Sequence, residues 1–198
     1  MRVSLCLVLA MLCVAPATLA QTPDSVLVVA NRSNQQSVAL ANYYMLKRHI
    51  PTANLLLVNW TAADNADQCT PAEYTSNFAI PIWNRLNISP AIDYVVLCRN
   101  LPSKMRDPIT AIVSSVDSCL TKNRSVQAIN PYYSKSTAFH NANYGGMRLV
   151  TRLDGWSWAD ATALVDRSIG ARKGLNFFLD LDPKRGYTGA MKVVVLSI

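Results

Sequence analysis

Wholly apolar runs alternate with amphipathic stretches along most of this chain. The runs at 26–30 and 55–58 have the continuous hydrophobicity of parallel strands that are buried on both faces. Between them, the segment from about Ser37 carries a helical stripe of apolar residues, and Pro51 prevents its continuation. The stretch from Val26 to Trp60 therefore predicts strand, polar turn, helix and strand, one βαβ unit to which the rest of the sheet is added.

The same alternation continues downstream. A helix is predicted from Pro71 to about Leu86, with Thr70 as its N-cap. Pro81 lies inside this helix and should kink it or split it, because proline removes one backbone donor and clashes with the preceding turn. Strand-like residues return at 93–98.

Asp107 and Pro108 predict the start of a third helix, over residues 107–120. The residues expected on its inward face are Ile109, Ile112, Val113, Val116 and Leu120. The segment 121–146 that follows has no sustained period, which is typical of a lid, a binding loop or disorder.

A strand over 147–153 and a further helix are predicted next, since Ser157 and Asp160 have the spacing of a capping box. Strand-like runs at 175–181 and 192–198 end the chain. Their connection is too short for a helical crossover, so either the last strand pairs antiparallel or the sequence stops partway through an element. The predicted fold class is α/β, three-layered, with a mainly parallel sheet, helices on both faces and a Rossmann-like or caspase-like topology.

The first twenty residues have the pattern of a signal peptide. Arg2 precedes an apolar run over 3–14, and Ala20 is a small residue placed for cleavage. The run is shorter than the approximately 20 residues that a spanning helix needs, so we expect no stable membrane span after cleavage. The protein is predicted to be exported, to a periplasmic or extracellular location, with residues 21–198 forming a single domain.

The formal net charge is +7, but the basic residues are spread along the chain. This distribution favours an ordinary cationic surface over nucleic-acid binding and leaves a cell-surface glycan or acidic surface open as a partner. Cys69, Cys98 and Cys119 follow the predicted signal and allow one disulfide and one free thiol, in three pairings. Cys69–Cys119 is the least unfavourable bridge, because Cys98 ends an apolar strand and is expected to be buried.

Polar side chains follow the predicted strands at the point where each strand ends. Parallel strands deliver these side chains to one edge of the sheet, where open α/β sheets bind ligands. The pattern predicts a pocket for an anionic or sugar-like ligand, although Arg–Asp pairs and Asx-turns that only hold the strand ends would leave the same pattern. The candidate ligand-binding residues are Asn31, Arg32, Ser33, Arg99, Asn100, Arg152, Asp154 and Asp180, with Asp182 beside the last.

No cofactor or metal is predicted. The turn at 31–34 has neither the GxGxxG nor the Walker pattern, which disfavours a nucleotide site. Asp180 and Asp182 are not followed by a third acid at the spacing of a calcium loop. His49 and His140 could in principle pair with a cysteine, but a helix end and an aperiodic loop are poor positions for a catalytic dyad.

Aromatic residues accompany the asparagines and serines near the fourth predicted strand. Trp156 and Trp158 would suit sugar stacking, but they flank a helix start, where packing is the more common role. We therefore expect both tryptophans to pack.

Four stretches stand in order behind the predicted signal: VLVVANRSNQQSVALANYYMLKRHIPTANLLLVNW, DYVVLCRNLPSKM, SSVDSCL and MRLVTRLDGWSWADATALVDR. In these stretches the chain resembles a family of uncharacterised exported bacterial proteins with no established activity. Members of that family usually have Glu at the position of Cys119, and they continue into a second half. The resemblance implies that this chain is the N-terminal part of a longer protein, and a hydrolase with catalytic residues in the absent part is the alternative function.

The family is also distantly similar in topology to caspase and gingipain proteases. Those enzymes place a His-Gly pair after the third strand and a Cys after the fourth. The corresponding residues here are 99–102 (RNLP) and 152–155 (RLDG), so protease function does not carry over.

Overall fold

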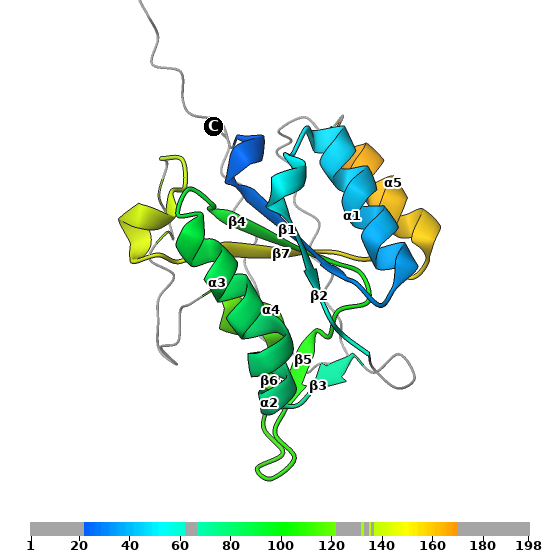
Figure 1. Cartoon of the computed structure of the whole chain (residues 1–198), viewed down its shortest axis with the longest axis vertical. Coiled ribbons are helices and arrows are strands. Elements are labelled where there is room, and N and C mark those ends of the chain that lie inside the picture. Colours follow the sequence, from blue (N-terminus) through cyan, green and yellow to red (C-terminus); the bar gives the residue numbers. More distant parts are fainter. Residues whose placement is uncertain (1–21, 62–66, 122–131, 133–134, 136, 170–198) are drawn as a thin grey trace, which may run out of the picture.

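A four-stranded parallel sheet forms the centre of the computed structural model, which describes residues 22–61, 67–121, 132, 135 and 137–169 (Figure 1). Its strands are β1 (Val26–Asn31), β2 (Leu55–Val58), β4 (Tyr94–Cys98) and β7 (Leu149–Leu153). They lie in the order β2-β1-β4-β7, and every neighbouring pair is parallel. The first strand, β1, thus lies in the interior of the sheet, with β2 on one side of it and β4 and then β7 on the other.

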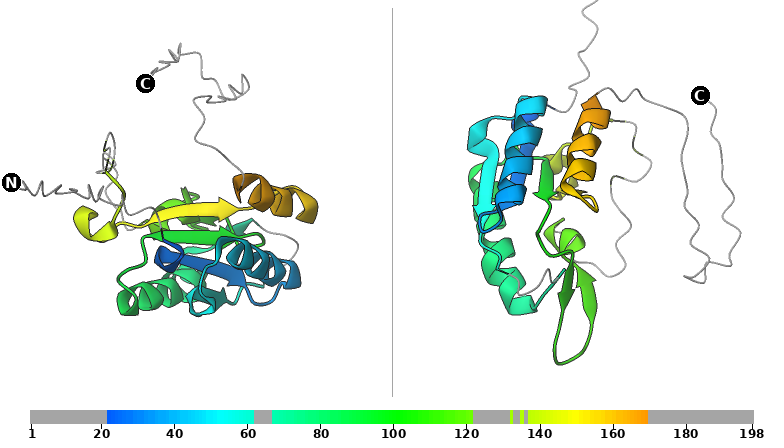
Figure 2. Two further views of the ribbon diagram at one scale, coloured as in Figure 1. Left: turned by 90° about the horizontal axis from the view of Figure 1, so that it is seen from above. Right: turned by 90° about the vertical axis from the view of Figure 1, so that its right-hand side faces the viewer.

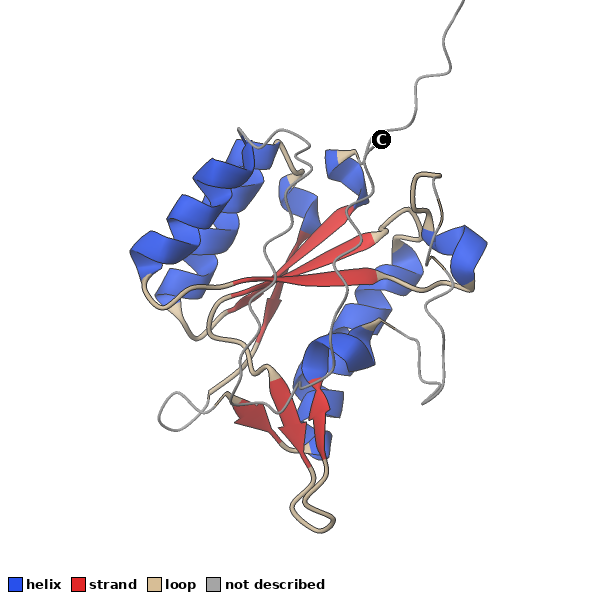
Figure 3. Cartoon of the chain, turned by 180° about the vertical axis from the view of Figure 1, so that it is seen from behind, coloured by secondary structure: helices blue, strands red, loops and turns tan. Residues whose placement is uncertain are grey.

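Helices cover both faces of this sheet, which confirms the predicted α/β class. Helices α1 (Gln35–Arg48) and α5 (Trp158–Ile169) lie side by side on one face, as Figures 2 and 3 show. The other face is covered by α2 (Pro71–Glu73), the π-helix η4 (Tyr74–Ala79), α3 (Ile80–Ile88) and α4 (Val116–Leu120). Short 3₁₀ turns at Pro23–Ser25 and Thr52–Asn54 precede β1 and β2.

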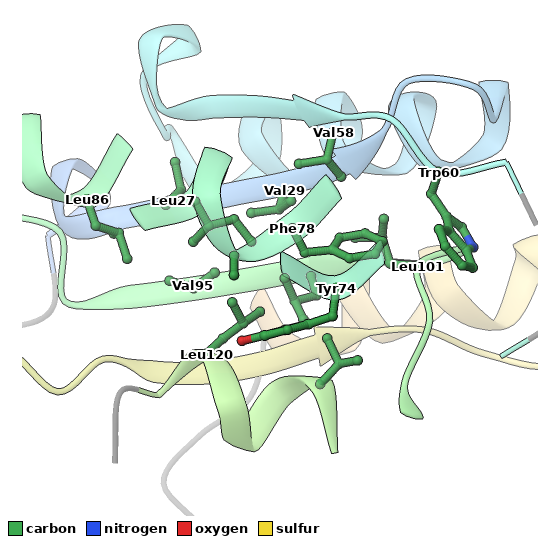
Figure 4. Close-up of a cluster of buried hydrophobic side chains, with 14 of the residues drawn as sticks. Leu27, Val29, Val58, Trp60, Tyr74, Phe78, Leu86, Val95, Leu101 and Leu120 are labelled. Carbon is green, nitrogen blue, oxygen red and sulfur yellow. The ribbon is translucent and has the colours of Figure 1, made fainter. Parts of the chain in front are cut away.

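The central strands are continuously apolar because each face of the sheet has its own core. Leu27 and Val29 of β1 pack with Phe78 on the α3 side, in the cluster drawn in Figure 4. The intervening Val28 and Ala30 pack on the α1 side. Since successive side chains of a strand point to opposite faces, a strand covered twice must be apolar at every position.

Helix α1 begins two residues before the predicted start at about Ser37. Asn34 caps it through its side chain, and His49 ends it in a left-handed conformation with φ of 55°. The predicted cap at Thr70 is confirmed. Thr70 and Glu73 form a reciprocal capping box at the start of α2. Pro81 lies at the start of α3, directly after a π-helical segment, so the expected disturbance of this helix takes the form of a wider turn.

The predicted third helix over 107–120 is wrong over most of its length. Residues Lys104–Arg106 (β5) and Val113–Ser115 (β6) form an antiparallel hairpin, and α4 occupies only the last turn of the predicted span. β3 (Gln68–Cys69) pairs parallel with β5, giving a second sheet in the order β3-β5-β6. The Asp-Pro pair starts a turn here, as this dipeptide often does.

Half of the aperiodic segment 121–146 and both predicted C-terminal strands lie outside the described residues. Within the described part, Asn141–Tyr144 is a 3₁₀ turn, and the Phe139 and Tyr144 rings stack with centroids 5.3 Å apart. None of Cys69, Cys98 and Cys119 is in a disulfide, so the Cys69–Cys119 bridge is not formed. None of the described helices is long and apolar enough to cross a membrane.

Candidate functional site

A polar pocket with a cavity volume of about 540 Å³ lies at the carboxyl edge of the parallel sheet. At this edge the chain leaves β1 toward β2 on one side of the sheet and leaves β4 toward β7 on the other side. Open α/β sheets characteristically bind ligands at such a point. The residues that line the pocket come from the turns after all four strands and are Asn31, Ser33, Asn34, Trp60, Thr61, Asp67, Arg99, Asn100, Leu101, Asp154, Gly155 and Trp156.

Asn31 joins three of these turns. It is the last residue of β1 and only 4 % exposed. Its side-chain nitrogen donates to the carbonyl of Asn100 at 3.1 Å, while its side-chain oxygen accepts from the backbone of Ser33 at 3.0 Å and of Trp60 at 3.3 Å. These partners use its side chain, so Asn31 shapes the pocket floor rather than offering free groups to a ligand.

Arg99 and Asn100 form the turn after β4. Arg99 donates to the backbone carbonyl of Trp156 at 3.1 Å and lies 3.9 Å from the carboxylate of Asp154. Asn100 adopts a left-handed conformation with φ of 63°, which asparagine tolerates better than most residues. Its side chain makes no hydrogen bond with other described residues, so its amide can serve as a ligand donor and acceptor.

Asp67 ties the pocket to the second sheet. Its carboxylate accepts from the backbone N–H of Ser103 at 2.8 Å and from the Ser103 hydroxyl at 2.6 Å, and it lies 3.6 Å from the Lys104 ammonium. Partial burial raises the pKa of Asp67, but the two hydrogen bonds from Ser103 and the nearby cations outweigh it and hold the pKa below its usual value. Asp67 is therefore a carboxylate at neutral pH.

The two tryptophans of the pocket differ in exposure. Trp60 is buried against Phe78, with ring centroids 5.5 Å apart, and in Figure 4 it lies beside Leu101 at one end of the core. Trp156 is 99 % exposed at the pocket rim. Trp158 packs on the α1–α5 side as expected, whereas the expectation that Trp156 also packs is wrong.

Gly155 brings the turn after β7 against the start of α5. A Cβ atom on this residue would lie 2.8 Å from the Cβ of Asp160, which leaves no room for any other residue. The capping box predicted for this helix is present, because Ser157 and Asp160 exchange backbone and side-chain hydrogen bonds. These bonds hold the pKa of Asp160 below its usual value. Trp156 is thus presented from a firmly capped turn.

Five of the eight candidate residues line the pocket: Asn31, Ser33, Arg99, Asn100 and Asp154. Arg32 is exposed and lies outside the pocket lining, although its backbone N–H donates to Val58 at 2.8 Å. Asp180 and its neighbour Asp182 lie outside the described residues.

Arg152 is engaged elsewhere. It donates to both carboxylate oxygens of Asp117, at 2.6 and 3.2 Å, and to the carbonyls of Leu101 and Pro102, at 2.8 and 2.9 Å. The Arg–Asp pairing that the sequence left open as an alternative to a ligand site is therefore what Arg152 does. It clamps the turn after β4 from outside the pocket.

The structure does not bring Cys98 and His140 together as a cysteine–histidine dyad. Cys98 is buried at the carboxyl end of β4, and burial, with a smaller effect of Asp154, raises the pKa of its thiol to about 12. His140 lies 3.0 Å from the carboxylate of Asp93, which precedes β4 at the opposite edge of the sheet. The length of β4 separates Cys98 at its carboxyl end from His140 beside its start by about 15 Å.

Sequence reasoning missed the contributions of Asp67, Thr61 and Trp60 to the pocket. Trp60 and Thr61 follow β2, so the rule used for the other strands would have found them. Asp67 comes from the loop toward the second sheet, and no local signal marks it. Among the described residues, no group of three or more His, Cys, Asp or Glu side chains is arranged to hold a metal ion.

The pocket combines hydroxyl, amide and carboxylate groups with one exposed indole. Within its lining, Arg99 is the one cation, and Asp67 and Asp154 are two acids. Comparison with models of protein families, with curated proteins and with solved structures finds no match to this chain. Functional inference therefore rests on the residues of the pocket.

Proposed function

We propose that this protein binds a glycan in the pocket at the carboxyl edge of the sheet. The observation that carries the proposal is Trp156, whose indole is 99 % exposed at the rim of a polar pocket. Exposing a whole tryptophan to water is unfavourable unless a partner covers it, and the apolar face of a sugar ring is a partner that also needs the polar groups below.

The pocket has donors and acceptors that suit sugar hydroxyl groups. The side chains of Ser33 and Asn100 make no hydrogen bond with other described residues, and the Asp154 carboxylate accepts one hydrogen bond, from the backbone of Gly155 at 2.8 Å. Hydroxyl groups both donate and accept, so a mixture of amide, hydroxyl and carboxylate groups can satisfy them.

The charges favour a neutral glycan over an anionic ligand. Arg152 is paired with Asp117, and Arg99 faces Asp154. With Asp67 as a second acid, the lining carries one more negative than positive charge, which opposes a carboxylate or phosphate group. A cell-surface glycan is consistent with the predicted export to a periplasmic or extracellular location. The hydrolase alternative gains no support from the described residues.

Binding of neutral oligosaccharides tests the proposal. Isothermal titration with cello-, xylo- and chito-oligosaccharides should find binding by at least one series, with oligogalacturonate as the anionic comparison. Trp156→Ala should weaken that binding by about tenfold or more, because it removes the stacking surface. Leu46→Ala is the matched control, since Leu46 is an exposed apolar residue of α1 at 74 % exposure.

The salt dependence separates the two ligand classes. Binding of a neutral glycan should change little with salt, whereas binding driven by ion pairs should fall steeply. Failure of every neutral series to bind, or equal affinities of the Trp156→Ala and Leu46→Ala proteins, would show that the pocket is not a glycan site.

A further inference from the structure

The tip of the β5–β6 hairpin is an exposed apolar surface that projects from the body of the protein (Figures 1 and 2). All six residues from Pro108 to Val113 are exposed, and five of them are apolar. Ile109 is 91 % exposed, Ile112 62 % and Val113 55 %. Single exposed apolar residues are ordinary, but three large ones within five positions at one projecting turn form a patch that calls for a partner.

The backbone of this tip keeps its hydrogen-bond donors internal. The carboxylate of Asp107 accepts from the N–H groups of Ile109 at 2.8 Å and Thr110 at 3.3 Å, and the Asp107 carbonyl accepts from Ala111 at 2.9 Å. Ile112 donates to the Thr110 hydroxyl at 3.4 Å and accepts from the N–H of Asp107 at 3.0 Å.

Pro108 has no N–H group, so every N–H from 107 to 112 is either absent or paired within the turn. A turn in water has no need of such complete pairing. In a hydrocarbon environment an unpaired N–H group is costly, so a turn that enters lipid is favoured when its donors are paired internally. The pairing of these donors therefore lowers the cost of moving the tip into an apolar medium.

Cationic side chains lie at the base of the apolar tip. Arg106 pairs in register with Val113, and Lys104 pairs with Ser115 two positions further from the tip. Arg106 is exposed and makes no hydrogen bond or ion pair with other described residues, and Lys104 makes an exposed pair with Asp67. The whole protein carries a net charge of +7, which adds attraction to an anionic surface.

We propose that the β5–β6 hairpin docks the protein on an anionic lipid surface, with Ile109 and Ile112 in the acyl region and with Arg106 and its cross-strand partner Val113 at the level of the headgroups. Ile109 lies three positions beyond Arg106, a separation of at most about 10 Å, which is within the depth that interfacially bound segments reach. A tip of six residues is much smaller than the 20–30 residues per side typical of stable protein interfaces, which disfavours a second copy as the occupant. This proposal is independent of the glycan site.

Co-sedimentation of the whole purified protein with lipid vesicles tests the docking. We expect it to bind vesicles of phosphatidylcholine mixed with phosphatidylglycerol more tightly than vesicles of phosphatidylcholine alone. Ile109→Ser/Ile112→Ser should weaken binding by about tenfold for each isoleucine removed. Arg106→Glu should reduce the preference for the anionic vesicles.

Ile88→Ser is the matched control, because Ile88 is 74 % exposed at the C-terminal end of α3, away from the hairpin. This control should bind vesicles as the unaltered protein does. Equal vesicle binding by the double variant and the control, or no binding by the unaltered protein, overturns the proposal. Sedimentation that shows a dimer lost only in the double variant also overturns it, since the tip would then contact a second copy.

Discussion

Arg152→Met is expected to destabilise the protein strongly although Arg152 lies outside the pocket. The guanidinium makes four hydrogen bonds, two to Asp117 and one each to the carbonyls of Leu101 and Pro102. The side chain of Arg152 is 15 % exposed and that of Asp117 30 %. Methionine keeps much of the apolar stem but leaves a partly buried carboxylate and two carbonyls without their donor.

The expected cost is about 3 kcal/mol. Removing one partner of a fully buried pair costs about 3–5 kcal/mol, and water reaching Asp117 should keep the loss near the lower end. For a chain of this size the midpoint of thermal unfolding should fall by about 6–12 °C. Urea unfolding followed by tryptophan fluorescence, with linear extrapolation, measures the free energy of unfolding.

Arg32→Met is the matched control, because Arg32 is also a strand-end arginine but has an exposed side chain with no hydrogen bond to other described residues. It should change the free energy of unfolding by less than about 0.5 kcal/mol. Combining Arg152→Met with Asp117→Asn should cost clearly less than the sum of the single changes, since the two residues interact directly. A loss below about 0.5 kcal/mol for Arg152→Met would refute the assignment of a clamp, because that is the range of an ordinary surface pair.

Two further predictions concern the core. Phe78→Ala should lower the free energy of unfolding by about 3–5 kcal/mol in the same urea assay, because Phe78 is 2 % exposed and fills the core between Trp60 and β1; a cost below about 1 kcal/mol would contradict this packing. Burial raises the pKa of the Cys98 thiol from 9.0 to about 12, so the native state keeps a proton that the unfolded chain loses. Cys98 should therefore make stability fall as pH rises between these values, a slope that Cys98→Ala removes. Thiolate absorbance near pH 9 that is present in the native protein and missing from native Cys98→Ala would contradict the burial.

The parts of the fold that follow from local pattern were predictable. A strand covered on both faces must be apolar at each position, so Val26–Asn31 and Tyr94–Cys98 are evident from sequence. The caps at Thr70 and Ser157 are short-range hydrogen bonds between nearby residues, which spacing alone reveals.

The hairpin and the roles of the arginines depend on distant residues. Ile109, Ile112 and Val113 fit a helical stripe as well as they fit a turn, and nothing within the segment shows that no core lies opposite them. Arg99 follows β4 and Arg152 is the penultimate residue of β7, but the Asp117 carboxylate, 35 residues away in the sequence, binds Arg152 outside the pocket. Strand ends therefore predicted the location of the site, while the partner of each charged group came only from the tertiary structure.

The hydrogen bonds of Asn31 also have a consequence for the order of folding. They reach residues 29 and 69 positions away, after β2 and after β4. They form only when both strands have docked on β1, and closing such long loops is entropically costly. We expect these bonds to be absent from the folding transition state, so that weakening them speeds unfolding and leaves the folding rate unchanged. The pocket would then be the last region to become ordered, acquiring its shape only in chains whose central sheet is already complete.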